Sequence, residues 1–421
     1  MLNPITKERE FNGVFGALAI SLGLPALITV FGLIFNSEGF NPNFKLDLSF
    51  NDFFNYDAWK FYCSWFFGLL AIDQVIPGKY LKGVTLRDGT QLTYKINGMN
   101  LLMFLLVIEG SRLFYLPELP ELKFIYDHQL QLTLVSIIFS FVLAVFVYVM
   151  SFFPNLKKNG VNTNEKILAL GGNTGNFIYD WFMGRELNPR IGPVDIKLFC
   201  ELKPGLLLWL FINLSCLYNQ YLNGKVTDSM ILINILQGWY IFDGVMNEEG
   251  LITMIDVTTD GFGFMLSFGD LALVPWSYSL QARFLSAQPV VLGKIRCVGI
   301  LAVSCLGYYI FHSSNLQKSN FKSGKLNHMK SLKTKTGSNL LIDGWWKLSQ
   351  HINYFGDWLI GLSWCLTTGF NTILTYFYIF YFAGLLIHRQ MRDDEKCSEK
   401  YGESWVEYKR QVPHKIIPYV Y

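Results

Sequence analysis

Long uncharged stretches recur along the chain and predict its architecture. A helix that crosses the hydrocarbon core of a bilayer needs about 20 mainly apolar residues. Five uncharged stretches meet or approach this length: 11–35, 131–153, 204–224, 297–317 and 358–387. The last is long enough for two helices, which we expect to be joined near Gly369 and Asn371.

Four weaker stretches raise the expected number of membrane helices. They are 61–76, 96–108, 230–245 and 251–274. Together with the five stronger stretches they predict about ten spans. We therefore expect an all-α, polytopic membrane protein whose residues 1–421 form a single membrane-embedded domain.

The composition agrees with this expectation. Hydrophobic residues make up 51% of the chain and charged residues only 16%, whereas soluble proteins have about 25% charged residues. A net charge of only +3 gives no bulk electrostatic support for nucleic-acid binding. The seven cysteines are scattered, without a C-x-x-C pair, so we expect neither a disulfide framework nor a metal site.

Basic residues collect in particular connecting segments. These are 77–95, 154–166, 185–203, 313–340 and the C-terminal tail. In a ten-helix topology they lie on the same side as the N-terminus, and the positive-inside rule makes that side cytosolic. The acidic segment 247–250 departs from this pattern, and we expect it to be more than a simple loop.

Three polar clusters could bind a ligand, although the chain has no G-x-G-x-x-G or P-loop motif in a suitable context. Lys318 and Lys322 are four residues apart and could hold a phosphate, or they could simply flank a membrane helix. The segment 343–357 could cap a helix or bind a ligand. The mixed-charge segment 388–408 could bind a ligand, or it could be solvated surface.

A fourth cluster places acids in an apolar stretch. Between 240 and 270 the titratable residues are Tyr240, Asp243, Glu248, Glu249, Asp256, Asp260 and Asp270. Carboxylates at membrane depth are costly, so they tend to face a cavity or a partner. Alternatively, several of them lie in a re-entrant loop and serve only the fold.

Two long motifs resemble signatures of the membrane sterol reductase family. They are GNFIYDWFMGRELNPR at 175–190 and LIHRQMRDDEKCSEKYG at 386–402. The segments 83–89 and 260–270 are most similar to the fungal sterol C-14 branch of that family. The resemblance implies a helical membrane domain with an NADPH pocket open to the cytosol. Residues 1–295 would lie mainly on the sterol side, and residues 296–421 would form the cofactor half.

The resemblance also implies a set of cofactor-binding residues. They are Lys318, Lys322, Leu341, Trp346, Asn353, Tyr354, Asp393, Cys397, Ser398, Glu399, Lys400, Tyr401 and Tyr408. The family usually has arginine where Lys322 stands. Lysine keeps the charge but lacks the bidentate fork of arginine, so we expect this contact to be looser.

The reaction implied is reduction of the C14=C15 double bond of a sterol intermediate in ergosterol synthesis. Protonation at C15 would create a tertiary cation at C14, and NADPH would quench it with hydride. Two alternatives are a reductase of another sterol double bond, at C-24(28) or C-7, and a non-catalytic receptor-like scaffold.

The candidates for the catalytic acid are Tyr240, Glu248 and Asp260. A free tyrosine holds its proton at neutral pH, so our hypothesis is that Tyr240 donates and one of the two carboxylates reloads it. Alternatively, Tyr240 is an interfacial aromatic beside Trp239.

The family resemblance and the basic segments also predict the binding partners and the cellular location. We expect a multi-pass protein of the endoplasmic reticulum membrane with both termini in the cytosol. Its partners would be the sterol substrate and the lipid bilayer, with other sterol-pathway enzymes as a further candidate.

Overall fold

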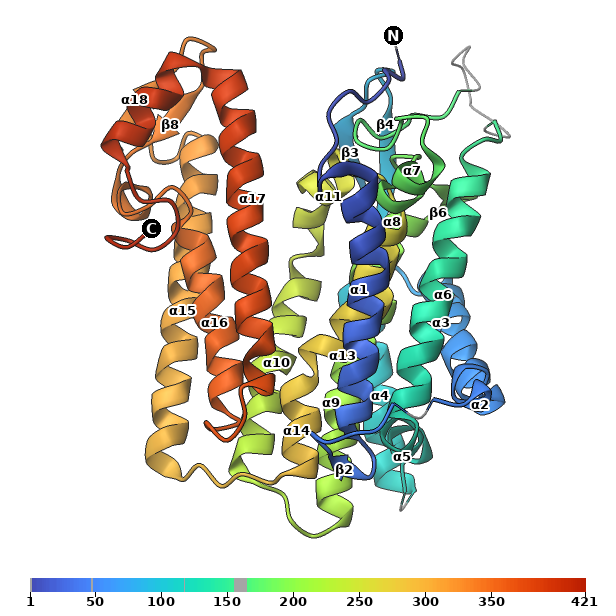
Figure 1. Ribbon diagram of the computed structural model, residues 1–421. Coiled ribbons are helices and arrows are strands. Elements are labelled where there is room, and N and C mark those ends of the chain that lie inside the picture. The colour runs from blue at the N-terminus through green and yellow to red at the C-terminus, as the bar shows by residue number, and fades with distance from the viewer. Residues whose placement is uncertain (1, 47, 117, 155–164) are drawn as a thin grey trace. The chain divides into compact units, whose positions relative to one another are not determined.

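The computed structural model describes the 421-residue chain except residues 1, 47, 117 and 155–164. The described chain is mostly helical and divides into two compact units (Figure 1). Unit 1 consists of residues 1–226 and 237–289, and unit 2 consists of residues 227–236 and 290–421.

Unit 1 is built from long helices joined by short elements. The long helices are α1 (Gly13–Ile34), α3 (Tyr56–Val75), α4 (Gly98–Tyr115), α6 (Gln129–Met150), α9 (Pro204–Leu222) and the second half of α10 (Asp228–Met246). The short helices are α2 (Phe50–Phe53), α5 (Pro120–Asp127), α7 (Phe177–Met183), α8 (Ile196–Leu202), α11 (Ile255–Thr258), α12 (Phe264–Phe268), α13 (Val274–Tyr278) and α14 (Leu280–Ala287). A 3-10 helix, η1 (Glu248–Thr253), and a π-helical turn, η2 (Gly269–Leu273), complete the helical elements.

Short antiparallel strand pairs modify the all-α expectation. Unit 1 contains β1 (Phe35–Asn36) with β2 (Gly39–Phe40), β3 (Lys79–Thr85) with β4 (Gln91–Ile96), and β5 (Arg190–Ile191) with β6 (Val194–Asp195). The basic segment 77–95 therefore forms a hairpin rather than an irregular loop. In Figure 1 this hairpin, α7 and the N-terminus lie at one end of the unit 1 helices, and α2 and α5 lie at the other.

Buried aromatic side chains form the core of unit 1. Trp276 is fully buried and donates from Nε1 to Ser136 Oγ at 2.9 Å. Tyr62 is 2% exposed and donates its hydroxyl to the Leu271 carbonyl at 3.1 Å. Each large ring buries about 150–250 Å², and these hydrogen bonds satisfy the ring's polar atom inside the core.

The predicted span 251–274 was wrong as a continuous helix. The range 248–263 contains the short helices η1 and α11 and the irregular residues 259–263, and the longer helical run starts at Phe264. The physical reason is a close backbone contact, because a Cβ on Gly261 would lie 1.9 Å from the Gly184 carbonyl oxygen. A Cβ on Gly263 would lie 2.2 Å from the Gly184 nitrogen. Only glycine permits two backbones to approach so closely. This contact prevents the segment around Gly261 and Gly263 from forming part of a continuous membrane helix.

Unit 2 contains three long helices and a small polar end. The long helices are α15 (Lys294–Lys322), α16 (Ile352–Leu366) and α17 (Phe377–Tyr401), and the short helix α18 (Glu403–Gln411) follows α17. The strands β7 (Ser331–Lys333) and β8 (Asn339–Leu341) pair, η3 (Gly344–Lys347) precedes α16, and η4 (Leu374–Tyr376) precedes α17. Helices α16 and α17 flank a break at 367–376, which confirms the expected junction near Gly369 and Asn371.

Two glycines let α15 and α16 pack closely. A Cβ on Gly307 of α15 would lie 2.7 Å from the Gly356 carbonyl oxygen. A Cβ on Gly356 of α16 would lie 2.6 Å from the Phe311 nitrogen. Small residues at such crossings are typical of membrane helices, because they allow the backbones to approach.

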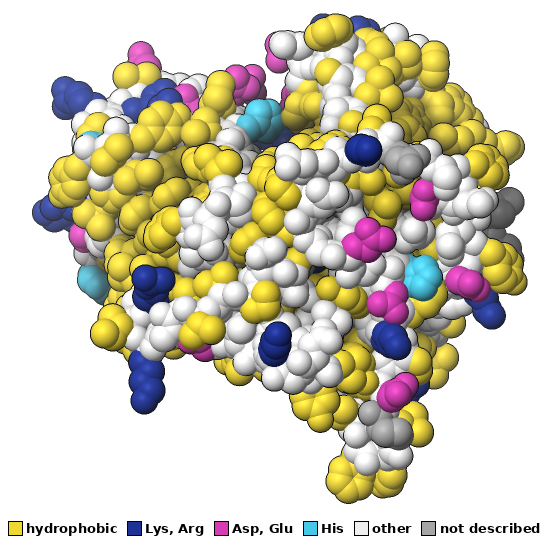
Figure 2. Space-filling view, turned by 60° about the horizontal axis from the view of Figure 1, so that its bottom comes forward, with side chains coloured by type: hydrophobic (Ala, Val, Ile, Leu, Met, Phe, Trp, Pro, Cys, Tyr) yellow, Lys and Arg dark blue, Asp and Glu magenta, His cyan; other side chains and the backbone are white. Residues whose placement is uncertain are grey.

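Six helical segments among the described residues are long and apolar enough to cross a membrane. They are Gly13–Ile34, Gly98–Tyr115, Gln129–Met150, Ile196–Leu222, Asp228–Met246 and Lys294–Lys322. Figure 2 shows broad hydrophobic areas on the face it displays. The chain is thus a membrane protein with several spans, and the remaining spans of the ten-helix topology stay a prediction.

Candidate functional site

In unit 2, an unpaired cation lies beside a buried aromatic ring. The Lys318 ammonium is 4.0 Å from the centroid of the Trp346 ring. Trp346 is 2% exposed and donates from Nε1 to the Ser314 carbonyl at 3.0 Å. Within the part of the chain that the structure describes, neither Lys318 nor Lys322 forms an ion pair with a carboxylate. Their charges are therefore available to an anionic ligand.

The surroundings of the two lysines suit a phosphate. Lys318 and Lys322 line one open surface pocket with Asn315, Ser319 and Ser323. Ammonium and hydroxyl groups donate hydrogen bonds, and phosphate oxygens accept them. The donor set therefore fits the phosphate of a dinucleotide.

The start of α16 adds groups that could contact the same ligand. Asn353 donates from Nδ2 to Asn315 Oδ1 at 3.2 Å, while its buried Oδ1 has no partner. Tyr354 donates its hydroxyl to Asp393 Oδ2 of α17 at 3.2 Å. A buried acceptor without a donor costs about 1–3 kcal/mol, so a ligand that donates to Asn353 would stabilise this arrangement.

His351 was not among the residues predicted from the sequence. Its ring stacks on Tyr354 with centroids 4.8 Å apart, and its Nδ1 lies 4.0 Å from Asp393 Oδ2. Burial, followed by the nearby Lys318 charge, lowers the His351 pKa to about 4 against the opposing effect of Asp393. The only sequence signal was its position inside the polar segment 343–357.

Of the remaining predicted cofactor residues, some are buried and others are exposed. Cys397 and Tyr401 pack on a buried cluster that includes Tyr408, and Leu341 is 7% exposed. Burial raises the pKa of the Cys397 thiol and raises that of the Tyr408 phenol further, so both are neutral at pH 7. Three neighbours on α17 are exposed: Ser398, Glu399 and Lys400.

The structure therefore connects part of the predicted cofactor set. A cation–π contact joins Lys318 to Trp346, and a hydrogen bond joins Tyr354 to Asp393. Lys322 shares a pocket with Lys318. The role of the whole predicted set in cofactor binding stays a prediction, for these connected residues as for the exposed residues 398–400.

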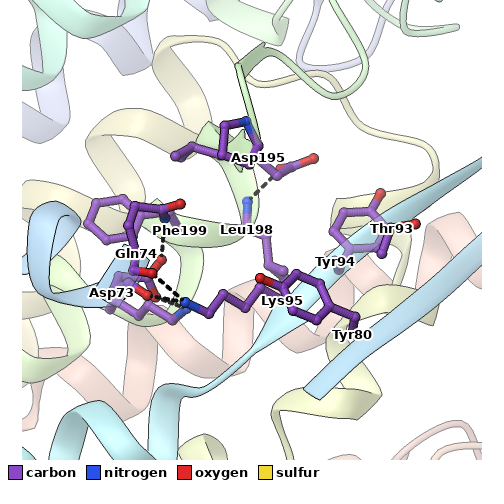
Figure 3. A pocket seen from close by; sticks show the side chains of 12 residues that line it. Asp73, Gln74, Tyr80, Thr93, Tyr94, Lys95, Asp195, Leu198 and Phe199 are labelled. Carbon is purple, nitrogen blue, oxygen red and sulfur yellow. Dashed lines mark hydrogen bonds and ion pairs between the residues drawn. The ribbon is translucent and has the colours of Figure 1, made fainter. Parts of the chain in front are cut away.

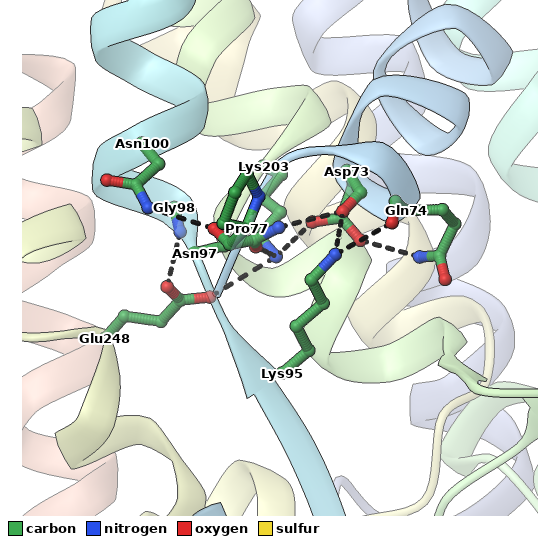
Figure 4. Close-up of polar contacts among 9 residues, drawn as sticks. All are labelled: Asp73, Gln74, Pro77, Lys95, Asn97, Gly98, Asn100, Lys203 and Glu248. Carbon is green, nitrogen blue, oxygen red and sulfur yellow. Dashed lines mark hydrogen bonds and ion pairs between the residues drawn. The ribbon is translucent and has the colours of Figure 1, made fainter. Parts of the chain in front are cut away.

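The candidate acid Glu248 belongs to a buried ion network in unit 1 (Figure 4). Glu248 is 1% exposed, and its Oε2 accepts from the Gly98 backbone nitrogen at 2.6 Å. Its Oε1 is 3.4 Å from the Lys203 ammonium. The same ammonium donates to Asp73 Oδ1 at 2.6 Å and to Asn97 Oδ1 at 2.7 Å. The expectation that segment 247–250 is not a simple loop is confirmed.

Tyr240 lies on α10, with its ring centroid 6.2 Å from that of Trp209. Six helical residues separate Tyr240 from the end of α10, which corresponds to about 9 Å along the axis. Direct proton transfer needs a separation of about 3 Å or one bridging water. A relay from Glu248 to Tyr240 would therefore need intermediate groups or waters.

Asp260 is 5% exposed and lies in the irregular segment before α12. Its backbone carbonyl accepts from the fully buried Lys197 ammonium at 2.7 Å. The same ammonium donates to the carbonyls of Asp256 and Val257 at 2.8 and 2.9 Å. Lys197 thus anchors the backbone of residues 256–260.

Two cavities of unit 1 differ sharply in chemistry. A polar cavity of about 40 Å³ lies beside the ion network, and Asp73, Lys95 and Asp195 are among its lining residues (Figure 3). Since one water needs about 10–15 Å³, this cavity is large enough for a few water molecules and too small for a sterol.

The second cavity has about 420 Å³ and an entirely apolar lining. Its walls come from α3, α6, the β5–β6 hairpin and α8: Phe66, Phe67, Leu70, Phe139, Val142, Leu143, Phe146, Ile191, Val194, Ile196 and Phe199. Its volume lies in the range of about 300–1,000 Å³ that is usual for small-molecule sites. The cavity therefore suits a rigid apolar ligand.

Comparisons with known proteins cover nearly the whole chain. The sequence model of the ergosterol biosynthesis ERG4/ERG24 family matches residues 5–421. The Candida albicans protein named Delta(14)-sterol reductase ERG24 is 59% identical over 443 residues, which cover 100% of this chain and 99% of the relative.

Two further relatives extend the comparison. The Saccharomyces cerevisiae Delta(14)-sterol reductase ERG24 is 57% identical and covers 100% of this chain and 99% of its own length. The chicken (Gallus gallus) protein named Delta(14)-sterol reductase LBR is 40% identical over 98% of this chain, but the match covers 64% of that relative.

Proposed function

This chain belongs to the ergosterol biosynthesis ERG4/ERG24 family, and on that premise we propose that it is an NADPH-dependent delta(14)-sterol reductase. It reduces the C14=C15 double bond of a sterol intermediate in ergosterol synthesis. The observation that carries the proposal is the end-to-end similarity to fungal enzymes of that name, at 59% and 57% identity.

The cofactor residues of unit 2 support a phosphorylated dinucleotide. Lys318 and Lys322 bind the 2′-phosphate that distinguishes NADPH from NADH, and Trp346 holds the Lys318 ammonium in place. Asp393 accepts from Tyr354, which orients its carboxylate. The bound nicotinamide supplies the hydride.

The protein must also supply a proton, because an isolated alkene is a poor hydride acceptor. Tyr240 donates the proton to C15, and the positive charge develops at C14. Aromatic faces stabilise a cation, and Phe66, Phe139 and Phe199 present such faces in the apolar cavity of unit 1. We assign that cavity to the sterol rings, since its lining carries no polar surface and the substrate is almost wholly apolar.

The proposed setting is the endoplasmic reticulum membrane with both termini in the cytosol. The basic connecting segments support this orientation through the positive-inside rule. The cytosol is also the source of NADPH. The apolar substrate reaches the protein from the bilayer.

The test is a direct assay of purified protein in lipid nanodiscs. The protein is offered NADPH with 14-ene, 7-ene and 24(28)-ene sterols, and the products are identified by mass spectrometry. We expect reduction of the 14-ene sterol alone. With NADPH deuterated at C4 the label appears at C14, whereas deuterium from solvent appears at C15. Reduction of a different double bond would reject the assignment.

A further inference from the structure

The apolar cavity of unit 1 adjoins the small polar cavity, and α3 forms part of the wall of both. Phe67 and Leu70 of α3 line the apolar cavity, whereas Asp73 and Gln74 line the polar one. The rise from Leu70 to these two polar residues is about 4.5–6 Å along the helix axis. On this wall the lining therefore changes from apolar to polar within about one helical turn.

Two other elements of unit 1 show the same change of lining. Phe199 of α8 lines both cavities, and Lys203, four residues further along the chain, lines the polar cavity only. In the β5–β6 hairpin, Val194 lines both cavities, and Asp195 lines the polar cavity only. Because three walls change in the same way, the two cavities together form one amphipathic space with Phe199 and Val194 at the boundary.

The polar cavity offers both a donor and an acceptor (Figures 3 and 4). Asp73 is 4% exposed, and its Oδ1 accepts from Lys203 and its Oδ2 from Gln74 at 2.6 and 2.8 Å. The Lys95 ammonium donates to the backbone carbonyls of Asp73 and Gln74 at 2.6 and 3.0 Å. Beyond these contacts with described residues, one ammonium hydrogen and one lone pair of Asp73 Oδ2 are available to a further partner.

A sterol matches this amphipathic space, because it is a rigid apolar molecule with a hydroxyl group at C3. A hydroxyl both donates and accepts. We propose that the polar cavity binds the 3β-hydroxyl of the sterol, which donates to Asp73 Oδ2 and accepts from the Lys95 ammonium. This assignment rests on the proposed function, in which the apolar cavity holds the sterol rings.

The assignment also fixes the orientation of the sterol. With the hydroxyl in the polar cavity, the rings extend past Phe199 and Leu70 into the apolar cavity. The reversed orientation would place the hydroxyl against apolar side chains without a partner, which is costly. The polar cavity of about 40 Å³ has room for a hydroxyl but not for a sterol ring system.

The experiment compares two 14-ene sterols with the full-length protein in nanodiscs, one with the 3β-hydroxyl and one with hydrogen in its place. Lys95→Met removes the ammonium and keeps most of the apolar stem. Lys82→Met is the matched control, because Lys82 is exposed on the same hairpin and does not line the polar cavity. Michaelis constants are compared between proteins for one sterol at a time, so that differences in membrane partitioning cancel.

We expect Lys95→Met to raise the Michaelis constant of the hydroxylated sterol about tenfold, as loss of a hydrogen bond from a charged donor does. The constant of the 3-deoxy sterol should not change, which also shows that the variant is folded. Lys82→Met should change neither constant. An equal rise for both sterols would indicate a general effect of the hairpin, and unchanged constants would place the hydroxyl elsewhere; either result would overturn the assignment.

A second measurement needs no variant. The 3α-hydroxy epimer has the same atoms as the 3β-hydroxy sterol but directs its hydroxyl differently from the ring plane. The original protein should show a Michaelis constant about tenfold higher for the 3α epimer, and equal constants for the two epimers would contradict the inference. If the original protein did not reduce the 14-ene 3β-hydroxy sterol at all, the proposed function itself would fail, and this inference with it.

Discussion

Removing the Lys203 ammonium should destabilise unit 1 strongly. Lys203→Met keeps most of the apolar stem but removes the charge that lies 2.6 Å from Asp73 and 3.4 Å from Glu248. The three side chains are 4%, 5% and 1% exposed, so the two carboxylates are shielded from bulk water. Breaking a buried ion pair by removing one member costs about 3–5 kcal/mol, and we expect the free energy of unfolding to fall by an amount in that range.

A second lysine of unit 1 provides a matched control. Lys79 forms an ion pair with Glu249 at 2.8 Å, but these side chains are 61% and 53% exposed. Exposed pairs contribute about 0–1 kcal/mol, so Lys79→Met should hardly change stability. Equilibrium unfolding in mixed detergent micelles measures both variants. Equal losses for Lys203→Met and Lys79→Met would refute the argument that burial makes the network strong.

The same network tests the role of Glu248. In a double-mutant cycle, Lys203→Met and Glu248→Gln should show a coupling energy of about 0.5–3 kcal/mol, because the two groups are in contact. If Glu248→Gln instead left stability unchanged and lowered turnover per folded molecule about 100-fold, as removal of a general acid does, Glu248 would be a proton donor rather than an anchor.

Four further outcomes are expected. Lys318→Ala should raise the NADPH Michaelis constant about tenfold and leave NADH kinetics unchanged. Substitution of the exposed Lys330 by Ala is the control and should change neither. Equally weakened binding of both cofactors would reject the assignment of Lys318 to the phosphate. Tyr240→Phe should lower turnover about 100-fold or more while NADPH binding stays intact, and near-normal turnover would remove Tyr240 from the mechanism. Val142→Trp should fill the apolar cavity and raise the sterol Michaelis constant about tenfold, whereas no change would show that the sterol binds elsewhere. Folding lowers the His351 pKa from 6.5 to about 4, so the free energy of unfolding of the original protein should fall by up to about 3 kcal/mol between pH 6.5 and 4. The His351→Gln variant should lack this pH-dependent loss in its unfolding curves. Identical pH profiles for the two proteins would contradict the prediction.

The amino-acid sequence was sufficient to predict the main helices and the class of reaction. The stretch 131–153 became α6 at 129–150, and 297–317 became part of α15 at 294–322. Such runs are local, because twenty apolar residues in a bilayer must satisfy their own backbone hydrogen bonds as a helix. The long motifs at 175–190 and 386–402 likewise needed no partner segment to indicate the family.

Only the tertiary structure decided where the charged groups are placed. The sequence marked Glu248 as a candidate acid in an apolar stretch but could not identify its partners, because Lys203 and Gly98 are 45 and 150 residues away along the chain. Gly261 looked like part of a span, but its contact with Gly184 keeps that segment irregular. Asp73 and Lys95 became candidates for binding the sterol hydroxyl only once the fold placed them beside the apolar cavity. Hydropathy follows from each residue alone, whereas pairing and burial depend on which distant segments the fold brings together.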